Sequence, residues 1–493
     1  MYFIMKTKNV SIFLIFSMLA AMIVVSCDDF LDIEPQLAVS DDAVYDSHDG
    51  VLNALYGAWD RTAGPQLYAG SSIFFSDLLA SSGQIAWSGT FIQYEQMEGK
   101  NMDPNSGNIA AIWNRSYWII DLVNNVLDNL DVVNEDVRPI VEGEARFIRG
   151  ILYFELVRLF GRAYTDGDPA VNPGVPLVLT PTAGITDADF RPRETVANVY
   201  ASLINDLVSS RNLLAGFTTY GANNGRATAS TAAAFLSRVY MTMENWEAAA
   251  NQASFVVENF EGYGALRNTP RQAYNNDSYT TEDVFMIIQD ATSNAGQAND
   301  GIGTFFASLD GYGRSDIDIK PMHLAMFEEG DLRALIDTVP DAVDIGDINR
   351  MLYLGVGRKA GRIQTSKWGK HDANINVIRL AEMILIRAEA NFRNGSSIGA
   401  QPLNDINAIR LRAGVGAWDN LTLEMIREER YREMCFEGRL MEDVRRFRED
   451  VVIPEGPADA GTVLPWNSPR MVLPIPQREI DVNPNLVQNE AYN

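Results

Sequence analysis

Stretches with helical periodicity recur along most of this chain, and they constrain its fold more than any other feature. In residues 376–395, apolar side chains follow one another at spacings of three and four, and Gly395 stands where a helix stop belongs. Helices with one apolar face must bury it against a neighbour, so the sequence predicts packed helices over the outer parts of the chain. The same pattern appears in residues 49–61, 109–130, 141–161, 195–214 and 230–259 and around Cys435.

The stretch 230–259 is interpreted as two helices joined at Glu244-Asn245. It resembles a tetratricopeptide repeat: Tyr240 stands at the large aromatic position of the first helix, Trp246 follows the turn, and Ala249 stands at the small position where two helices approach closely. One such pair cannot bury its faces alone and needs stacked neighbours. We therefore expect a tetratricopeptide-like helical repeat scaffold.

The middle of the chain has a different composition. Residues 260–370 are rich in Gly, Asn, Asp and aromatic residues, with short strand-like runs such as DVFMIIQD, and residues 78–108 form a second loop-rich insert. Long ordered loops are usually functional, so we expect an irregular, loop-rich ligand lobe there. The helical scaffold is then predicted at about 40–260 and about 375–493.

The start of the chain has the layout of a signal peptide. Two lysines precede an uncharged apolar run over residues 10–25, which is short for a membrane span and ends in Ser26-Cys27. This ending resembles a bacterial lipobox, in which the thiol carries the lipid. Residues 1–26 are therefore predicted to be a lipoprotein signal peptide, with lipidation at Cys27 and a mature domain over 27–493. The alternative is a retained single-span anchor.

The charge of the chain argues against several kinds of partner. It carries 40 Lys and Arg against 65 Asp and Glu, a formal net charge of −25. Nucleic acids and anionic lipid headgroups would be repelled. With Cys27 committed to lipid, Cys435 has no partner, so no disulfide is expected and Cys435 is interpreted as a small buried residue.

No motif names a catalytic residue, a cofactor or a metal site. The three histidines, His48, His323 and His371, are isolated, and the GVGRKAG segment at 355–361 misses both phosphate-loop spacings. The acid clusters DGYGRSDID and DAVDIGDIN could hold calcium or be solvated loop acids. Two carboxylates acting as in a glycosidase stay open as an alternative, since their separation in space is not readable from the sequence. We expect no enzyme activity.

Aromatic residues on the predicted loops are the most informative candidate site. A sugar presents C–H groups on one face of its ring and hydroxyls at its edge, so a flat aromatic surface ringed by amides and carboxylates suits it. The competing interpretation is that these rings pin the loops to the body. The candidate platform consists of Trp87, Phe91 and Tyr94 in the first insert and Tyr274, Tyr279 and Tyr312 in the second.

Three places together resemble the SusD/RagB family of outer-membrane nutrient-binding lipoproteins. The first is Cys27 with the DDFLDIEPQ that follows it, and the second is VIRLAEMILIRAEA at 377–390. The third place is a C-terminal series of Glu429-Arg430, Glu433, Glu437-Gly438-Arg439, Asp443, Arg445, Pro474-Ile475-Pro476, Glu479, Asn483-Pro484 and Gln488-Asn489. This series departs from the family pattern at its end, where Asn489-Glu490-Ala491-Tyr492 replaces Asn-Pro-Gly-Tyr.

The resemblance implies an all-α body of four stacked tetratricopeptide-like pairs with an irregular lobe. It also implies a lipid-anchored protein on the extracellular side of the outer membrane that captures oligosaccharides for a SusC-like TonB-dependent transporter. The acids after Cys27 are similar to the signal that sends such lipoproteins to the cell surface. Members of the family for peptides and other nutrients exist, so a peptide ligand, a surface glycosidase and a pure scaffold remain alternatives.

Overall fold

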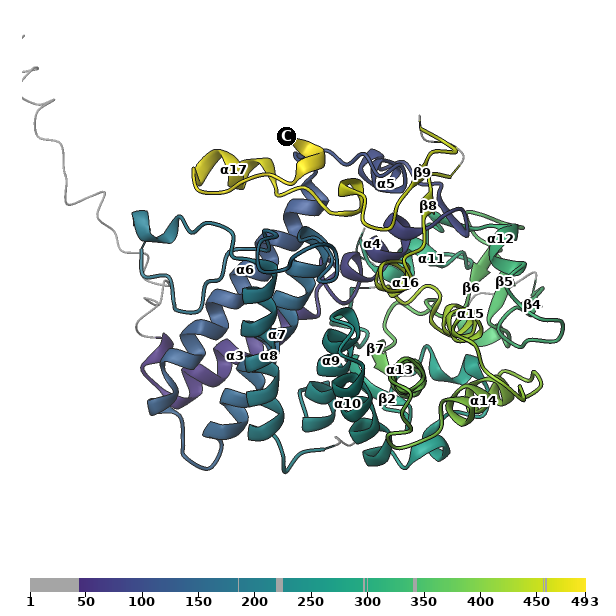
Figure 1. Cartoon of the computed structure of the whole chain (residues 1–493), viewed down its shortest axis with the longest axis horizontal. Coiled ribbons are helices and arrows are strands. Elements are labelled where there is room, and N and C mark those ends of the chain that lie inside the picture. The colour runs from purple at the N-terminus through teal and green to yellow at the C-terminus, as the bar shows by residue number, and fades with distance from the viewer. Residues whose placement is uncertain are drawn as a thin grey trace, which may run out of the picture.

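Long helices that pack on one another in chain order form one half of the molecule (Figure 1). The computed structural model describes residues 44–184, 186–218, 225–295, 298, 300–339, 344–454, 456 and 459–493, so the leader and Cys27 lie outside the described residues. The predicted all-α scaffold is confirmed. Its first helices are α3 (His48–Thr62), α6 (Gly107–Asp128), α7 (Arg138–Phe160), α8 (Val196–Leu213), α9 (Ala229–Thr242) and α10 (Trp246–Asn259).

Residues with side-chain oxygens begin several of these helices, because the first backbone N–H groups of a helix lack partners within it. Thr195 accepts a hydrogen bond from the N–H of Asn198, and Asn245 does the same for Ala248. Thr228 and Thr231 form a reciprocal capping box at the start of α9. The helices therefore begin where their local sequence provides a cap.

The helix pair α9–α10 has the predicted tetratricopeptide-like form. The chain turns at Glu244, whose φ of 57° is left-handed, and α10 begins at Trp246. Ala249 and the other alanines of this face, Ala250 and Ala253, are buried, which allows α10 to pack closely on both α9 and α13. The scaffold continues through α13 (Leu380–Asn394), α14 (Pro402–Arg412), α15 (Leu423–Met434) and α16 (Leu440–Phe447).

The stretch 376–395 corrects one detail of the prediction. Its first residues form a strand, β7 (Ile375–Arg379), which pairs antiparallel with β2 (Asp283–Ile287), and only then does α13 begin. Gly395 ends α13 in the left-handed conformation, as predicted, with φ of 63°. Partners about 90 residues apart in the sequence decide the strand, so helical periodicity alone placed the start of the helix too early.

Short strands and short helices make up the lobe beside the scaffold. The strand β1 from the first insert pairs with β3 from the second, so the two loop-rich segments form one unit. Its strands are β1 (Ile85–Trp87), β3 (Ile317–Ile319), β4 (Ile336–Asp337), β5 (Leu352–Leu354) and β6 (Ile363–Thr365), and β8 (Val451–Val452) pairs with β9 (Val463–Leu464). The remaining helices are α4 (Ser71–Ala80), α5 (Ile92–Glu98), α11 (Ile302–Phe306), α12 (Pro321–Leu324) and α17 (Gln477–Val482).

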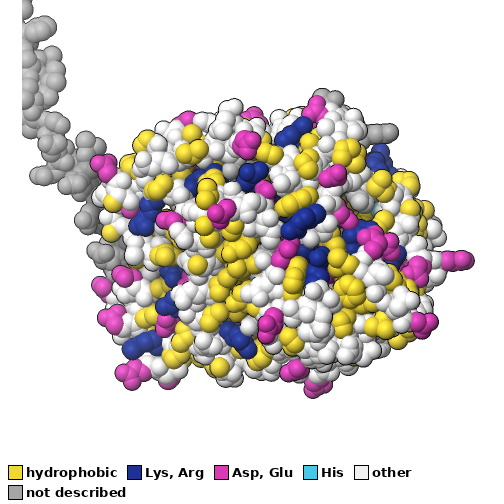
Figure 2. Space-filling model, viewed as in Figure 1, with side chains coloured by type: hydrophobic (Ala, Val, Ile, Leu, Met, Phe, Trp, Pro, Cys, Tyr) yellow, Lys and Arg dark blue, Asp and Glu magenta, His cyan; other side chains and the backbone are white. Residues whose placement is uncertain are grey.

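Charged side chains of both signs are interspersed on the face of the molecule drawn in Figure 2, with apolar side chains scattered between them. The excess of acidic residues is therefore spread over this face and does not collect in one patch. Among the helices of the described residues, none combines the length and the apolar composition that crossing a membrane requires.

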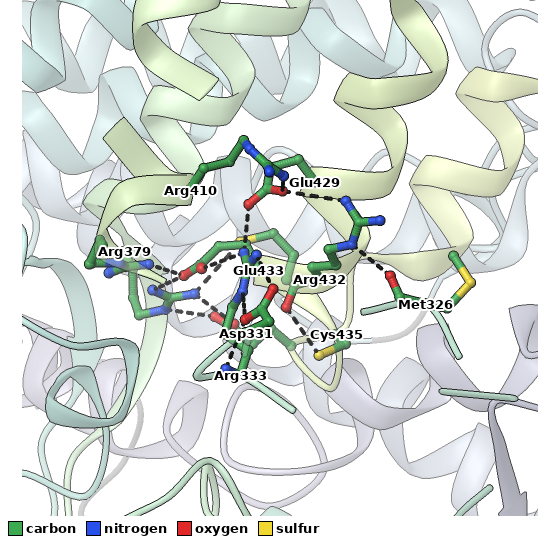
Figure 3. Close-up of polar contacts among 12 residues, drawn as sticks. Met326, Asp331, Arg333, Arg379, Arg410, Glu429, Arg432, Glu433 and Cys435 are labelled. Carbon is green, nitrogen blue, oxygen red and sulfur yellow. Dashed lines mark hydrogen bonds and ion pairs between the residues drawn. The ribbon is translucent and has the colours of Figure 1, made fainter. Parts of the chain in front are cut away.

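A buried cluster of ion pairs joins the lobe to the scaffold (Figure 3). Arg379, at the junction of β7 and α13, lies 2.8 Å from Glu282, 3.0 Å from Glu433 and 2.7 Å from Glu437, and its side chain is fully buried. Arg333 of the lobe lies 2.7 Å from Glu429 of α15. Each partner compensates for the burial of the other's charge, so the cluster fixes α13 and α15 relative to the lobe.

The ten-residue helix α4 lies against the eight-residue helix α16, although the two are far apart in the sequence. The carboxylate of Asp77 accepts hydrogen bonds from the backbone N–H of Gly438 at 2.9 Å and of Leu440 at 3.1 Å. Gly438 has φ of +72°, and a Cβ there would lie 2.7 Å from the carbonyl oxygen of Ile73. Only glycine fits this close approach without strain.

Buried carboxyl groups titrate on both sides of the usual range, so we expect stability to peak at mildly acidic pH. Burial raises the pKa of Asp77 and of Asp283 to about 7. Burial also disfavours the charged forms of Glu437 and Glu442, but the arginines that they contact lower the pKa of each to about 2. Asp77 and Asp283 therefore stabilise the fold increasingly as the pH falls from about 7 to 4. Glu437 and Glu442 lose their stabilising contribution as the pH falls further, from about 4 to 2.

Urea unfolding of residues 28–493 between pH 2 and pH 8 checks this expectation. The free energy of unfolding should be greatest near pH 4–5, roughly where both pairs contribute, and should fall on either side. Self-repulsion of the excess acidic residues acts in the same direction at neutral pH. A free energy that increases steadily up to pH 8 would contradict the assignment of the raised pKa values.

Candidate functional site

A cavity of about 230 Å³ lies between the end of α3, the middle of α6 and the segment that follows β2. Its wall includes Arg61 of α3, Pro65 of the turn after it, Arg115 of α6, and Ser293 and Asn294 of the segment after β2. Guanidinium, hydroxyl and amide groups thus converge on one space from three parts of the chain. A concave site with convergent hydrogen-bonding groups suits a polar ligand.

Asp290 holds the segment after β2 in a fixed turn. Its Oδ1 accepts hydrogen bonds from the backbone N–H groups of Thr292 and Ser293, at 2.7 and 2.8 Å, and from the hydroxyl of Thr292. These hydrogen bonds, with that of the Thr292 hydroxyl first, lower the pKa of the Asp290 carboxyl below its usual range. The side chains that line the cavity beyond this turn are therefore held on a defined backbone.

Gln289 connects the cavity to a smaller neighbouring pocket, because it lines both. Its backbone N–H donates to Asn374 Oδ1 at 2.9 Å. The amide nitrogen of its side chain donates to the backbone carbonyl oxygens of Ala373 and His371, at 3.1 and 3.2 Å. The smaller pocket adds Lys370 to the polar groups of this region. The two pockets are therefore neighbours that share a wall, and together they are called the polar area.

Tyr312, one of the six predicted platform residues, lies beside this area. Its half-buried ring is tilted against His371, with ring centroids 5.6 Å apart. A Cβ on Gly303 would lie 2.3 Å from the Tyr312 hydroxyl, so only glycine lets the ring approach α11 this closely. Burial raises the pKa of Tyr312 well above its usual value, so the phenol stays protonated and can donate.

Trp87, Phe91 and Tyr94 lie together, but in a packed aromatic cluster and not on open loops. Trp87 belongs to β1 and Tyr94 to α5, and the ring of Phe305 from α11 lies 5.8 Å and 5.4 Å from theirs. Tyr94 is 0 % exposed and its hydroxyl donates to Asp300 at 2.6 Å. For Tyr94 the platform prediction is corrected, because other rings cover it. Trp87 and Phe91 are half-buried.

The other two predicted aromatics lie apart from the cavity. Tyr274 is 3 % exposed, its hydroxyl donates to Glu437 at 2.7 Å, and its ring packs against Trp368 and Arg379. Tyr274 therefore belongs to the buried ion cluster, which corrects its place on a ligand platform. Tyr279 is half-buried and packs on the main core.

The sequence interpretation missed the arginines of the cavity and the tryptophan between them. Trp118 is 48 % exposed, and the guanidinium carbons of Arg61 and Arg115 lie 4.2 and 5.5 Å from its ring centroid. Arg115 and Trp118 are three residues apart on α6, a spacing that places them on one helix face. That spacing is visible in the sequence, but the approach of Arg61 from α3 is not.

Two titratable side chains away from the cavity, His323 and Cys435, have strongly shifted pKa values. His323 is buried with its Nδ1 2.9 Å from the Tyr431 hydroxyl, and burial lowers its pKa to about 3. Cys435 is a free, half-buried thiol whose pKa burial raises to about 11. Within the described ranges, no three His, Cys, Asp or Glu side chains are grouped as metal ligands.

Two family models match the chain, one at each end. Residues 29–241 match a model described as starch-binding and associating with the outer membrane, and residues 342–492 match the model of the SusD family. The second match covers the C-terminal series of motifs and ends one residue before the end of the chain.

Relatives and solved structures resemble the chain over most of its length. SusD-like protein P25 of Formosa agariphila is 22% identical over 99% of both chains. The starch-binding protein SusD of Bacteroides thetaiotaomicron is 32% identical over 30% of this chain and 31% of its own. The crystal structure of a SusD superfamily protein from Bacteroides thetaiotaomicron superposes with a TM-score of 0.75 at 24% identity, covering 90% of this chain and 99% of that one.

Proposed function

The chain belongs to the SusD/RagB family, and from this premise we propose that it is a non-catalytic surface lipoprotein that captures oligosaccharides. The captured glycan would pass to a SusC-like TonB-dependent transporter in the outer membrane. Starch binding is stated for the family model and for one relative, and the proposal extends glycan binding to this chain.

The observation that carries the proposal is the polar cavity with Tyr312 beside it. Sugar hydroxyls need donors and acceptors at fixed positions, which Ser293 and Asn294 offer on the wall. The apolar face of a sugar ring needs a flat aromatic surface, which the half-buried ring of Tyr312 offers at the edge of this area. The two requirements are met in neighbouring pockets, because Gly303, which Tyr312 approaches, lines the smaller pocket and Gln289 lines both.

The lipid anchor on Cys27 is part of the proposal. Between Cys27 and the first described residue, Val44, lie 16 residues of chain. A chain of this length spans at most about 55 Å when extended. An anchor so close to the folded body would hold the cavity near the membrane, where a transporter could receive the ligand.

Binding of neutral and acidic oligosaccharides to residues 28–493, measured by calorimetry or affinity electrophoresis, tests the proposal. We expect binding to at least one glycan class, and replacing Tyr312 by Ala should weaken it about three- to tenfold, since an aromatic contact contributes roughly 0.5–1.5 kcal/mol. The control is Tyr263→Ala, which removes a tyrosine of 38 % exposure that contacts Asp405 and Arg387 instead.

Other outcomes would favour the alternatives. Binding of a peptide pool without any glycan binding would indicate a peptide receptor in the same family. Release of shorter products by the protein alone would establish a glycosidase. Unchanged uptake in cells carrying both Trp87→Ala and Tyr312→Ala would favour a scaffold that only supports the transporter.

A further inference from the structure

Two arginines of the cavity face the same space from different helices. Arg61 lies on the last turn of α3 and Arg115 on α6, and both line the cavity wall. The ring of Trp118 lies against both guanidinium groups and orients them. Partial burial, followed by the nearby positive charge of Arg61, lowers the pKa of Arg115. The two guanidinium groups therefore flank one ring and face one cavity.

Most hydrogen-bond donors of these two arginines are unused within the described residues. Each guanidinium has five N–H donors. Arg61 Nη1 donates to the carbonyl of Gly57 at 3.2 Å, and Arg115 Nη2 donates to Gln66 Oε1 at 3.1 Å. Nε of Arg61 is buried without a partner in the described part of the chain. Neither arginine forms an ion pair with a described carboxylate, whereas most buried arginines of this chain do.

The charge of the cavity wall opposes the charge of the whole chain. Its charged residues are Arg61, Arg115 and Asp60, so positive charge prevails there although the chain has a net charge of −25. Asp60 is exposed, so water screens its repulsion of an anion strongly. Arg61 and Arg115 are half-buried, so their attraction of the same anion is screened less. Two unpaired guanidinium groups in a concave site are the usual arrangement for binding carboxylate or sulfate oxygens through parallel N–H···O bonds.

We propose that this cavity binds an anionic sugar unit, and that Arg61 and Arg115 hold its charged group. The inference rests on the proposed function and narrows its ligands to acidic glycans. The shared chemistry is a planar or tetrahedral group of anionic oxygens, either the carboxylate of a uronic acid or a sulfate ester. Ser293 and Asn294 lie where they can bind the hydroxyls of the same or the adjoining sugar.

Calorimetry of residues 28–493 with three kinds of oligosaccharide tests the inference. The probes are oligogalacturonate as the carboxylated glycan, carrageenan oligosaccharides as the sulfated glycan, and maltohexaose with xyloglucan oligosaccharides as the neutral ones. The variants are Arg61→Gln and Arg115→Gln, each of which keeps a polar side chain of similar reach. The control is Arg478→Gln, which removes the same charge from an exposed position on α17.

We expect at least one acidic probe to bind, each cavity variant to weaken it about tenfold or more, and the control to change it less than about twofold. Carboxylated and sulfated probes then identify the charged group. The inference is wrong if neutral probes bind as tightly as acidic ones and the cavity variants bind normally, and glycan capture itself would stand. Equal losses in Arg478→Gln would also overturn it. If no probe binds, the proposed function fails with it. Circular dichroism confirms that each variant is folded.

Discussion

Replacing Arg379 by Ala should lower the free energy of unfolding by about 3–5 kcal/mol, the usual cost of breaking a buried ion pair from one side. The carboxylates of Glu282, Glu433 and Glu437 would remain buried without their shared cation. Burial disfavours the charged form of Glu433, and Arg412 and Arg379 outweigh it to hold its pKa far below the usual range. Without Arg379, these glutamates must take up protons when the protein folds, because unpaired buried charges are costly.

Urea unfolding at pH 7 measures this loss, with Arg427→Ala as the matched control. Arg427 pairs with Glu424 at 2.5 Å, but the Glu424 side chain is 63 % exposed, so the control should cost less than about 1 kcal/mol. Equal losses in the two variants would contradict a special role of the buried cluster. If Arg379→Ala gives no folded protein, Glu437→Gln provides a milder break, because it keeps the shape of the side chain and one of its two acceptor oxygens.

Replacing Phe285 by Ala is expected to cost about 3–5 kcal/mol as well, through the cavity it leaves. Phe285 is 2 % exposed, and its ring lies among those of Trp59, Phe147 and Phe235, at centroid distances of 6.1, 5.5 and 6.0 Å. It thereby attaches β2 to α3, α7 and α9. Because β2 runs directly into the segment that lines the 230 Å³ cavity, we also expect weaker glycan binding in the folded fraction.

Thermal unfolding and calorimetry with a bound glycan measure both effects. Phe217→Ala is the control, since Phe217 is 39 % exposed and lies beyond the end of α8. The control should change stability by less than about 0.5 kcal/mol. Lost stability with unchanged affinity would mean that the cavity wall is held independently of β2.

Helices were predictable because their signal is local. Apolar residues recur at spacings of three and four over 109–130 and 141–161, so each repeat of the pattern spans only one or two turns. The caps at Thr195 and Asn245 also lie within one turn of the backbone groups that they bind. β7 was not predictable in this way, because its partner β2 lies about 90 residues upstream. The five residues of β7 fit the helical pattern of the stretch that follows, and only the pairing with β2 makes them a strand.

The candidate site shows the same limit more strongly. Composition placed aromatic residues in the inserts, but it could not tell Tyr312, beside the cavity, from Tyr94, which five other rings surround. An aromatic ring suits a packed core and a binding surface equally well, so burial decides between them. The cavity itself needs three separate segments to meet at Arg61, Arg115 and Ser293, and no local pattern encodes that meeting.

The contact between α4 and α16 also sets the order in which the chain can complete its fold. Every residue of α4 is buried, and its Asp77 is held by backbone groups 361 and 363 residues further along the chain. While the chain is being synthesised, the face of α4 that packs on α16 must therefore wait until nearly nine-tenths of the whole polypeptide has been made. Closing so long a loop is slow and leaves apolar surface open to wrong partners in the meantime. That waiting period is the interval in which chaperones have most to protect.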